Sequence, residues 1–335
     1  MNYPESKLIL EKIKKAKRIL VNCHRGPDAD SVGSAMAMYN VLKKAGKNVE
    51  IVYPSKSIPS NFNFINEHEV IKKKIDFTKF DFKKYDLFVT LDSSDWKQIF
   101  GLDEVVSPNI PVVVIDHHRT NTRYGIINLV DETISSTGEL LYMVFQDWKI
   151  KIDKDTADSL LMAIAGDTVA FRYANENTFD IASRLMKLGA DKKVIIFNLF
   201  QRADFRLLKF WGKVLERMHM DRKGGFVWSA VPLLEYMELG KLSEARSSAS
   251  TLFTQIVEDT DFGMVMVEEV ENSLSVSFRS RTGFDTSKLA SQLGGGGHIF
   301  ASAAKIEGLP FNKAVKKVLR VARKYAREAK SSGTS

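Results

Sequence analysis

The chain has 335 residues, of which 44% are hydrophobic and 27% charged, and its formal net charge is +8. This length has room for two domains with complete hydrophobic cores. No apolar run approaches the roughly 18 residues of a membrane span, and the N-terminus does not resemble a secretory signal. The single cysteine, Cys23, excludes an internal disulfide framework and predicts a reducing, cytoplasmic location.

In the first half of the chain, short runs rich in branched residues alternate with helical stretches. Continuous apolar strands separated by helices predict a parallel sheet with helices on both faces. We therefore expect an α/β domain over residues 1–191. Its predicted strands are 18–23, 49–53, 86–91 and 110–115, and its predicted helices are 31–45, 155–165 and 179–188.

The second half begins with a stretch of helical pattern and mixed charge at residues 192–220, which we interpret as a connector. After it, we expect a smaller α+β domain over residues 221–335. The strands 263–270 and 273–278 are expected to pair through the short connection between them. The other predicted elements here are the strand 226–231 and the helices 287–293 and 311–330.

Aspartates and histidines gather at four places, each just past a predicted strand or helix. For any one of these places, a helix cap or a turn is the commoner explanation of an aspartate. Four in one half-chain favour a binding site, because ligands of open α/β sheets bind beyond the carboxyl ends of the strands. Imidazole and carboxylate groups together suit Mn²⁺, Mg²⁺ or Zn²⁺. The four places are His24 with Asp28 and Asp30, Asp92, Asp116 with His117 and His118, and Asp167.

The motif Asp116-His117-His118, with H-x-x-P-D-x-D-x-x-G-S beginning at His24, resembles the DHH phosphoesterase family. Further along, Phe278-Arg279-Ser280 precedes Gly294-Gly295-Gly296-Gly297-His298, a pair similar to the signature of the DHH-associated C-terminal domain. Together these motifs resemble the NrnA group of oligoribonucleases, which also dephosphorylate 3′-phosphoadenosine 5′-phosphate. The resemblance implies a parallel-sheet DHH domain and a smaller α+β domain across a cleft.

The resemblance also implies a pair of divalent cations, with Mn²⁺ favoured over Mg²⁺, and Asp92 bridging them. Two such ions about 3.5–4 Å apart can share one water and lower its pKa. The implied metal ligands are His24, Asp28, Asp30, Asp92, His117 and Asp167. The implied catalytic group is Asp116, His117 and His118, in which Asp116 orients a histidine and His118 faces the phosphate.

The substrate would be bound in part by the second domain. Arg279 can bind a phosphate through two parallel hydrogen bonds, whereas Arg281 is a weaker candidate. A run of four glycines alone is equally well explained as a turn, and His298 shifts the balance towards phosphate recognition. The implied substrate-binding residues are His118, Arg279, Ser280, Gly295, Gly296, Gly297 and His298. Two positions depart from the family pattern, which usually has glycine where Ala29 and Ala303 stand.

Two further features have ordinary explanations. Ser136-Thr137-Gly138-Glu139 has the spacing of a capping box at the start of a helix. The last helix has basic residues on one face, which is explained as a solvated face, with attraction to nucleic acid as the alternative. The basic residues are Lys313, Lys317, Arg320, Lys324 and Arg327.

The sequence thus favours a phosphodiesterase that hydrolyses short oligonucleotides or dinucleotides, such as nanoRNA, pApA or c-di-AMP, to mononucleotides, with 3′-phosphoadenosine 5′-phosphate as a second substrate. A pyrophosphatase or polyphosphatase and a RecJ-like exonuclease are the enzymatic alternatives, and a nucleotide sensor is the non-enzymatic one. The expected partners are a short nucleic acid and a second copy of the chain, but no membrane. The native metal, the direction of attack and the preference between RNA and DNA stay open.

Overall fold

The computed structural model describes residues 2–56, 58–102, 107–242 and 245–331. The chain divides into two compact units, 1–202 and 203–335. The predicted connector is therefore not one body, because α7 (Lys192–Phe200) lies in the first unit and α8 (Phe205–Glu216) in the second. Among the described residues, no helix is both long enough and apolar enough to cross a membrane.

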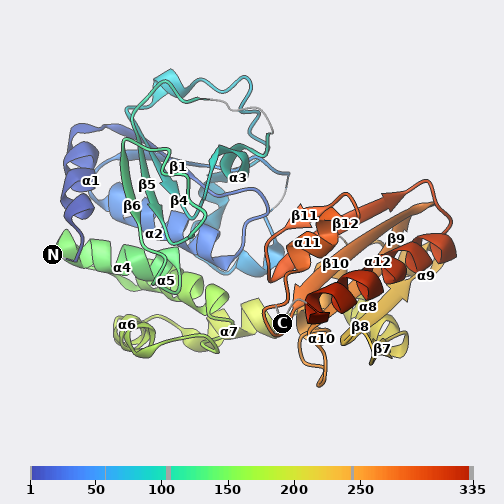
Figure 1. Cartoon of the computed structure of the whole chain (residues 1–335). Coiled ribbons are helices and arrows are strands. Elements are labelled where there is room, and N and C mark those ends of the chain that lie inside the picture. The colour runs from blue at the N-terminus through green and yellow to red at the C-terminus, as the bar shows by residue number, and fades with distance from the viewer. Residues whose placement is uncertain (1, 57, 103–106, 243–244, 332–335) are drawn as a thin grey trace. The chain divides into compact units, whose positions relative to one another are not determined.

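The first unit is built on a six-stranded sheet of order β3-β2-β1-β4-β5-β6, in which every pair of neighbours is parallel. The parallel sheet with helices is thereby confirmed (Figure 1). Its strands are β1 (Arg18–Asn22), β2 (Asn48–Val52), β3 (Ile71–Lys72), β4 (Leu87–Leu91), β5 (Val112–Asp116) and β6 (Ile127–Val130). Its α-helices besides α7 are α1 (Pro4–Lys15), α2 (Ala29–Lys44), α3 (Trp96–Phe100), α4 (Thr137–Asp147), α5 (Lys154–Asp167) and α6 (Glu176–Lys187).

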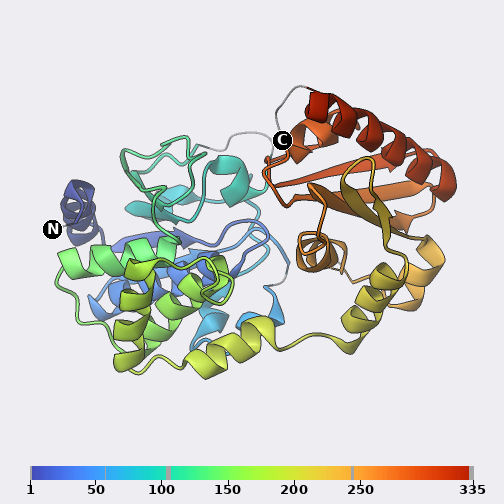
Figure 2. The same cartoon turned by 60° about the horizontal axis from the view of Figure 1, so that its bottom comes forward.

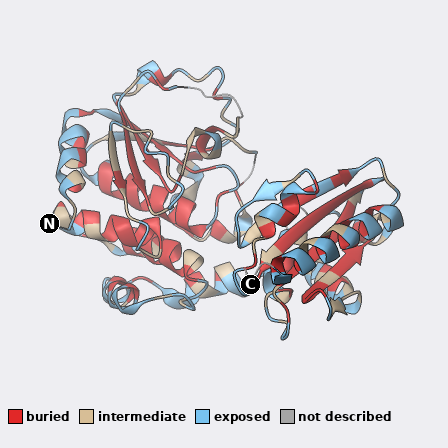
Figure 3. Cartoon of the chain, in the orientation of Figure 1, coloured by how far each residue is buried: buried red, intermediate tan, exposed pale blue. Residues whose placement is uncertain are grey.

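The two faces of this sheet are covered unequally. Alternate strand residues such as Val21 and Val89 join a large core with α1, α2, α4 and α5. Their neighbours Leu20 and Phe88 face the other way, into an aromatic-rich cluster with α3 and the 3-10 turn 82–84. Both faces are apolar because helices and turns cover both, which is why the strands read as continuous hydrophobic runs. Figure 3 shows the buried strands of this sheet and the buried sides of its helices in red.

The second unit has a six-stranded mixed sheet of order β11-β12-β10-β9-β8-β7, in which only β8 and β9 are parallel among the described pairs. The α11 and α12 helices cover one face, and α8, α9 and α10 contribute to the core on the other. The strands are β7 (His219–Asp221), β8 (Phe226–Val231), β9 (Phe262–Val270), β10 (Ser273–Ser280), β11 (Gly296–Gly297) and β12 (Ala301–Glu307). The helices besides α8 are α9 (Leu233–Glu238), α10 (Ala245–Phe253), α11 (Thr286–Ser291) and α12 (Phe311–Ser331).

Candidate metal centre

Three neighbouring strands of the first sheet end beside one another, and each is followed by a polar side chain. His24 comes after β1, Asp92 after β4, and Asp116 is the last residue of β5. These strands are adjacent in the order β1-β4-β5, so their carboxyl ends meet at one edge of the sheet. The start of α2 adds Asp28 and Asp30 to the same place, and the end of α5 adds Asp167.

A first group of possible ligands is formed by His24, Asp28 and Asp92, whose ligand atoms all lie within 4.8 Å of one another. The Nε2 atom of His24 is 3.6 Å from Oδ1 of Asp28 and 3.3 Å from Oδ2 of Asp92. Asp28 is also the N-cap of α2, since its Oδ1 accepts a hydrogen bond of 2.9 Å from Ser31 N. The capping and ligand explanations of Asp28 are thus compatible.

A second group is formed by Asp30, His117 and Asp167, and Asp92 lies beside it. The Nε2 atom of His117 is 3.2 Å from Oδ2 of Asp167 and 3.8 Å from Oδ2 of Asp30. The same nitrogen is 3.6 Å from Oδ1 of Asp92. Asp92 therefore turns one oxygen towards His24 and the other towards His117, an arrangement that suits a carboxylate shared by two cations.

Negative charge is concentrated in this buried place. Burial, together with the charges of Asp92 and Asp167, raises the pKa of Asp30 well above its ordinary value. Burial likewise raises the pKa of Asp167 to about 6, although His117 opposes the shift. For His117, burial would lower the pKa, but the carboxylate of Asp167, 3.2 Å from Nε2, and the charges of Asp30 and Asp92 outweigh that effect and raise the pKa to about 10.

Two buried atoms of this cluster lack a hydrogen-bond partner among the described residues, namely Asp92 Oδ2 and His117 Nε2. Leaving such atoms unpaired costs about 1–3 kcal/mol each. A divalent cation bound by these atoms would remove that penalty and offset the charge of the carboxylates. The donor set is oxygen and imidazole nitrogen without sulfur, so these residues fit a hard or borderline divalent cation.

Asp116 and His118 form a pair at the edge of the cluster, where Nδ1 of His118 is also 3.7 Å from Oδ1 of Asp92. The Nδ1 atom of His118 donates to Oδ1 of Asp116 at 2.7 Å, while Asn121 Nδ2 donates to Oδ2 at 2.6 Å. Burial would lower the pKa of His118, but its hydrogen bond with Asp116 outweighs that effect and raises it. The carboxylate of Asp116 thus orients His118, whereas the Nε2 of His117 faces the other aspartates.

The start of α4 donates hydrogen bonds to the carboxylates of Asp30 and Asp92, a role that was not predicted from the sequence. The backbone N–H groups of Thr137 and Gly138 donate to the two oxygens of Asp30 at 2.6 and 2.9 Å. The hydroxyl of Thr137 donates to Oδ1 of Asp92 at 3.2 Å. Ser136 does cap the helix, since its hydroxyl accepts from Glu139 N, so the capping motif was the available signal. A helix N-terminus stabilises a carboxylate, which explains why this one lies against Asp30.

The backbone at Asp92 is unusual, because its φ of 51° lies in the left-handed region that favours glycine. Its N–H donates to Ile115 O at 3.2 Å, which continues the ladder between β4 and β5 past the end of the strand. The turn directs the side chain into the cluster. Such a conformation at a buried polar residue is typical of functional sites.

In the second unit, Arg279 and Ser280 end β10. The Nε atom of Arg279 donates to Thr251 Oγ1 at 3.1 Å, and no acidic partner of Arg279 lies within ion-pair distance in the part of the chain that the structure describes. Burial, and then the charge of Arg246, lowers its pKa. Ser280 has an internal role, since its hydroxyl accepts from Gly283 N at 3.0 Å.

The glycine run has a structural reason at two of its positions. A Cβ at Gly295 would lie 2.1 Å from Ala303 O, and one at Gly297 would lie 2.6 Å from Ser302 Cα. At Gly296, nothing lies within 4 Å. The last two glycines, Gly296 and Gly297, form β11, an exposed strand paired with β12, and His298 is exposed at the turn between them. Close packing against β12 therefore explains part of the motif without a ligand.

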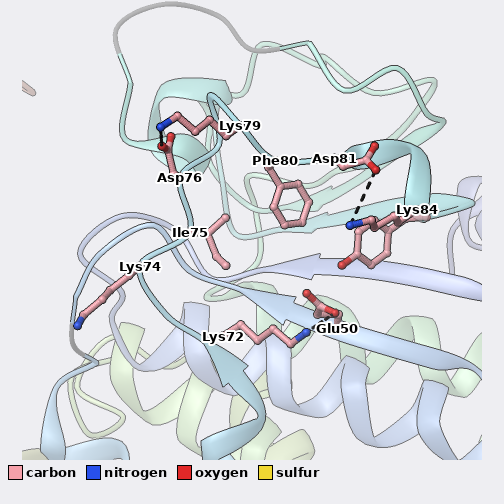
Figure 4. Close-up of a pocket in the computed structure, with 10 residues that line it drawn as sticks. Glu50, Lys72, Lys74, Ile75, Asp76, Lys79, Phe80, Asp81 and Lys84 are labelled. Carbon is pink, nitrogen blue, oxygen red and sulfur yellow. Dashed lines mark ion pairs between the residues drawn. The ribbon is translucent and has the colours of Figure 1, made fainter.

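A surface pocket of about 400 Å³ lies elsewhere in the first unit, lined by four lysines and several acidic and aromatic side chains. Figure 4 shows Lys72 directed at Glu50, and Lys79 and Lys84 paired with Asp76 and Asp81. Most lysines of this pocket are paired with carboxylates of the same pocket. The pocket is therefore a weaker candidate for binding an anion than the cluster of aspartates and histidines is for binding a cation.

Two family models match parts of the chain. The model of the DHH family, N-terminal domain, matches residues 18–164, and that of the DHHA1 domain matches residues 240–328. The chain is 27% identical over 327 residues to the bifunctional oligoribonuclease and PAP phosphatase NrnA of Thermus thermophilus, covering 96% of this chain and 94% of the relative.

Two other similar proteins extend the comparison. The cyclic-di-AMP phosphodiesterase PdeA of Listeria monocytogenes is 25% identical over 94% of this chain, which spans 48% of that relative. The crystal structure of an exopolyphosphatase-related protein from Bacteroides fragilis superposes with a TM-score of 0.88 at 23% identity, covering 97% of both chains, and shows the shared fold. The chain therefore contains a DHH family N-terminal domain followed by a DHHA1 domain.

Proposed function

We propose that this chain is a two-metal phosphodiesterase that hydrolyses short oligonucleotides or dinucleotides to mononucleotides. The observation that carries the proposal is the position of Asp92, whose two oxygens face two different groups of ligands. A phosphatase activity on 3′-phosphoadenosine 5′-phosphate is part of the proposal. It is supported by the similarity to NrnA proteins named for both activities.

The residues of the first unit have distinct parts in this mechanism. His24, Asp28 and Asp92 would hold one cation, and the second group, also with Asp92, would hold the other. When bound, such a pair lowers the pKa of a shared water and stabilises the attacking and leaving oxygens. We favour Mn²⁺ over Mg²⁺, because each group includes an imidazole ligand, and Mg²⁺ prefers oxygen.

His118 would act on the phosphate. Its Nδ1 hydrogen bond to Asp116 holds the ring in one orientation and raises its pKa, so the ring can keep a proton on each nitrogen. A protonated imidazole stabilises negative charge that grows on the phosphate oxygens in the transition state. Asn121 holds the second oxygen of Asp116, which fixes this pair further.

The second unit would recognise the nucleotide. Arg279 has a guanidinium that no described carboxylate neutralises, which leaves it able to bind a phosphate. The β11–β12 turn exposes His298 and Phe300, and exposed rings of this kind can stack on bases. Ser280 and the glycines at 295 and 297 would then serve mainly to shape the strands that carry these groups.

The experiment that tests the proposal is product analysis after metal removal and restoration of Mn²⁺. The substrates are a diadenylate, a five-residue RNA, 3′-phosphoadenosine 5′-phosphate, a cyclic dinucleotide and pyrophosphate. We expect metal-dependent release of mononucleotides from the linear substrates. Turnover of pyrophosphate above all others would favour a pyrophosphatase, and tight binding without turnover would favour a sensor; either would refute the proposal.

A homodimer and a cytoplasmic location are further parts of the proposal. Helices α6 and α7 expose several large apolar side chains, and a second copy of the chain could cover them. The exposed side chains are Phe179, Met186, Val194, Phe197 and Phe200. Light scattering of the wild type and of Phe197→Asp tests this, since loss of a dimer is expected only if α7 forms the interface. The proposed cytoplasmic location is inferred from Cys23, which forms no disulfide and is fully buried.

A further inference from the structure

The positive charge of the chain is concentrated on one helix. The 21-residue helix α12 contains eight lysines and arginines and one acidic residue, Glu328. It therefore carries +7 of the formal net charge of +8, and the remaining residues, with 41 basic and 40 acidic side chains, are almost neutral. A chain that was uniformly basic would not show this distribution. The charge of the whole protein is thus a property of α12.

All eight cations of α12 lie on its exposed side, along about 26 Å of helix from residue 313 to residue 330. Three have acidic partners: Arg323 with Asp221 at 2.6 Å, Lys324 with Glu328 at 3.8 Å, and Lys330 at 4.0 Å from Asp261. The other five have no carboxylate within ion-pair distance in the described ranges of the chain. These five, named here the basic face, are Lys313, Lys316, Lys317, Arg320 and Arg327.

The opposite side of α12 is firmly packed, and this fixes the direction of the basic face. Val318 and Ala322 are fully buried in the core between α12 and the second sheet. Figure 2 shows α12, in dark red, lying along one face of that sheet. In β10, Val276 and Phe278 face this core, so Arg279, one residue further along, projects from the other face. The basic face and Arg279 are therefore separate surfaces of the second unit.

We propose that the basic face binds the phosphate backbone of single-stranded RNA, outside the residues assigned to hydrolysis. Five unpaired cations at spacings of one to seven residues form a continuous positive row, which matches a polymer with one negative charge per nucleotide. A membrane surface fits less well. Interfacial helices insert an apolar face into the lipid, whereas the apolar face of α12 is buried against its own sheet and no exposed residue of α12 is apolar.

The binding is measured by fluorescence anisotropy on the full chain with Mn²⁺ and a labelled 20-residue RNA of mixed sequence. The chain carries Asp92→Asn, and a gel checks that the probe stays intact. If all five cations contact phosphates, the plot of log K against log salt concentration should have a slope of about −3.5, at about 0.7 per contact for single strands. Vesicles containing phosphatidylserine serve as a second probe.

The test variant is Lys316→Glu with Lys317→Glu and Arg320→Glu, which reverses three exposed charges of the basic face. The matched control on α1 is Lys12→Glu with Lys14→Glu and Lys15→Glu. Both variants change the net charge of the protein by the same amount. A loss of RNA affinity in the α12 variant alone would therefore show binding at the basic face and not a general attraction by net charge. A second variant with glutamine at 316, 317 and 320 removes the three charges without reversing them, so it is less able to disturb the fold. Circular dichroism checks that each protein is folded.

We expect the α12 variant to lose at least about tenfold in RNA affinity at 0.1 M salt. The plot of log K against log salt concentration should become shallower, with a slope smaller in magnitude by about 2. The control should stay within about twofold of the parent, and the glutamine variant should fall between them. Equal losses in the α12 and α1 variants would overturn the proposal, as would no loss in either. Binding to the vesicles without binding to RNA would also overturn it and would assign the surface to lipid.

Discussion

The two units of the chain present their candidate residues in opposite ways. In the first unit, Asp30 and Asp92 are almost completely buried, and backbone N–H groups or neighbouring side chains hold them in place. In the second, Arg279 is partly exposed and His298 is exposed on an edge hairpin. Buried, mutually supported groups suit chemistry that needs fixed geometry, whereas exposed groups suit the recognition of ligands that vary. The comparison predicts that changes in the first unit affect turnover and changes in the second affect binding.

The largest effect is expected from Asp92→Asn. The substitution keeps the shape of the side chain but weakens the shared ligand of both groups, so kcat should fall by at least about 10³-fold while the protein stays folded. Asp180→Asn on the exposed side of α6 makes the same chemical change as a control and should leave kcat unchanged. Near-normal turnover of Asp92→Asn, with metal content measured in parallel, would refute the bridging role.

Metal affinity should depend steeply on pH, because protons and cations compete for the same side chains. The pKa of Asp167 is raised to about 6, so this carboxyl is protonated below that pH and must lose its proton to bind a cation. His117, with a pKa of about 10, must also lose a proton to bind a cation. The affinity for Mn²⁺ should therefore fall by about tenfold per unit as the pH drops towards 6, and by about a further tenfold per unit below it. Calorimetry between pH 5 and pH 7.5 in buffers of different ionisation enthalpy measures both quantities. A pH dependence that does not steepen below about pH 6 would remove Asp167 from the ligands.

Arg279→Ala should raise KM by about 10- to 100-fold, in line with the loss of a charge-assisted hydrogen bond, and should change kcat much less. The matched control is Arg281→Ala, since Arg281 is two residues further along and its guanidinium donates to the backbone oxygen of Thr260. Steady-state kinetics on a dinucleotide separate KM from kcat. An unchanged KM for Arg279→Ala would exclude this arginine from substrate binding, and an equal effect of both variants would point to a general loss of positive charge.

The smallest effect is expected from Gly296→Ala, because a Cβ at this position has no neighbour within 4 Å. Its thermal stability should equal that of the wild type, and KM should rise by a few-fold at most if the backbone contacts a phosphate. Gly295→Ala should instead lower the free energy of unfolding by about 1–3 kcal/mol, because its Cβ would collide with the backbone of β12. Equal stability of the two variants would contradict the packing explanation of the glycine run.

Much of the fold could be predicted from periodicity alone. The predicted strand 226–231 coincides with β8, and the final helix differs from α12 by one residue. The hairpin of β9 and β10 was also predicted, and Asn272 in its turn has the positive φ of 57° that such a connection requires. Within the predicted connector the structure has two helices, α7 and α8, and a helical pattern in the sequence gives no sign of the break between them.

The sequence could name the aspartates and histidines of the centre but not what supports them. His24, Asp92 and Asp116 are recognisable because strand ends are recognisable, and parallel strands end at one edge. The hydrogen bonds from the start of α4 to Asp30 connect residues more than 100 positions apart. Since Thr137 and Gly138 act largely through backbone N–H groups, the capping motif at Ser136 marks the start of α4 but does not show which residue that helix contacts. The roles of the ligands and of the substrate-binding residues stay predictions.

The left-handed backbone at Asp92 has a consequence for any attempt to make this protein more heat-resistant. A non-glycine residue in this conformation destabilises the native state by about 1–3 kcal/mol. Asparagine tolerates the same conformation better and carries no charge. A laboratory selection for heat resistance alone would therefore enrich Asp92→Asn and discard catalysis along the way. The proposed bridging role would set stability against activity at this residue, so a useful screen would select for both at once.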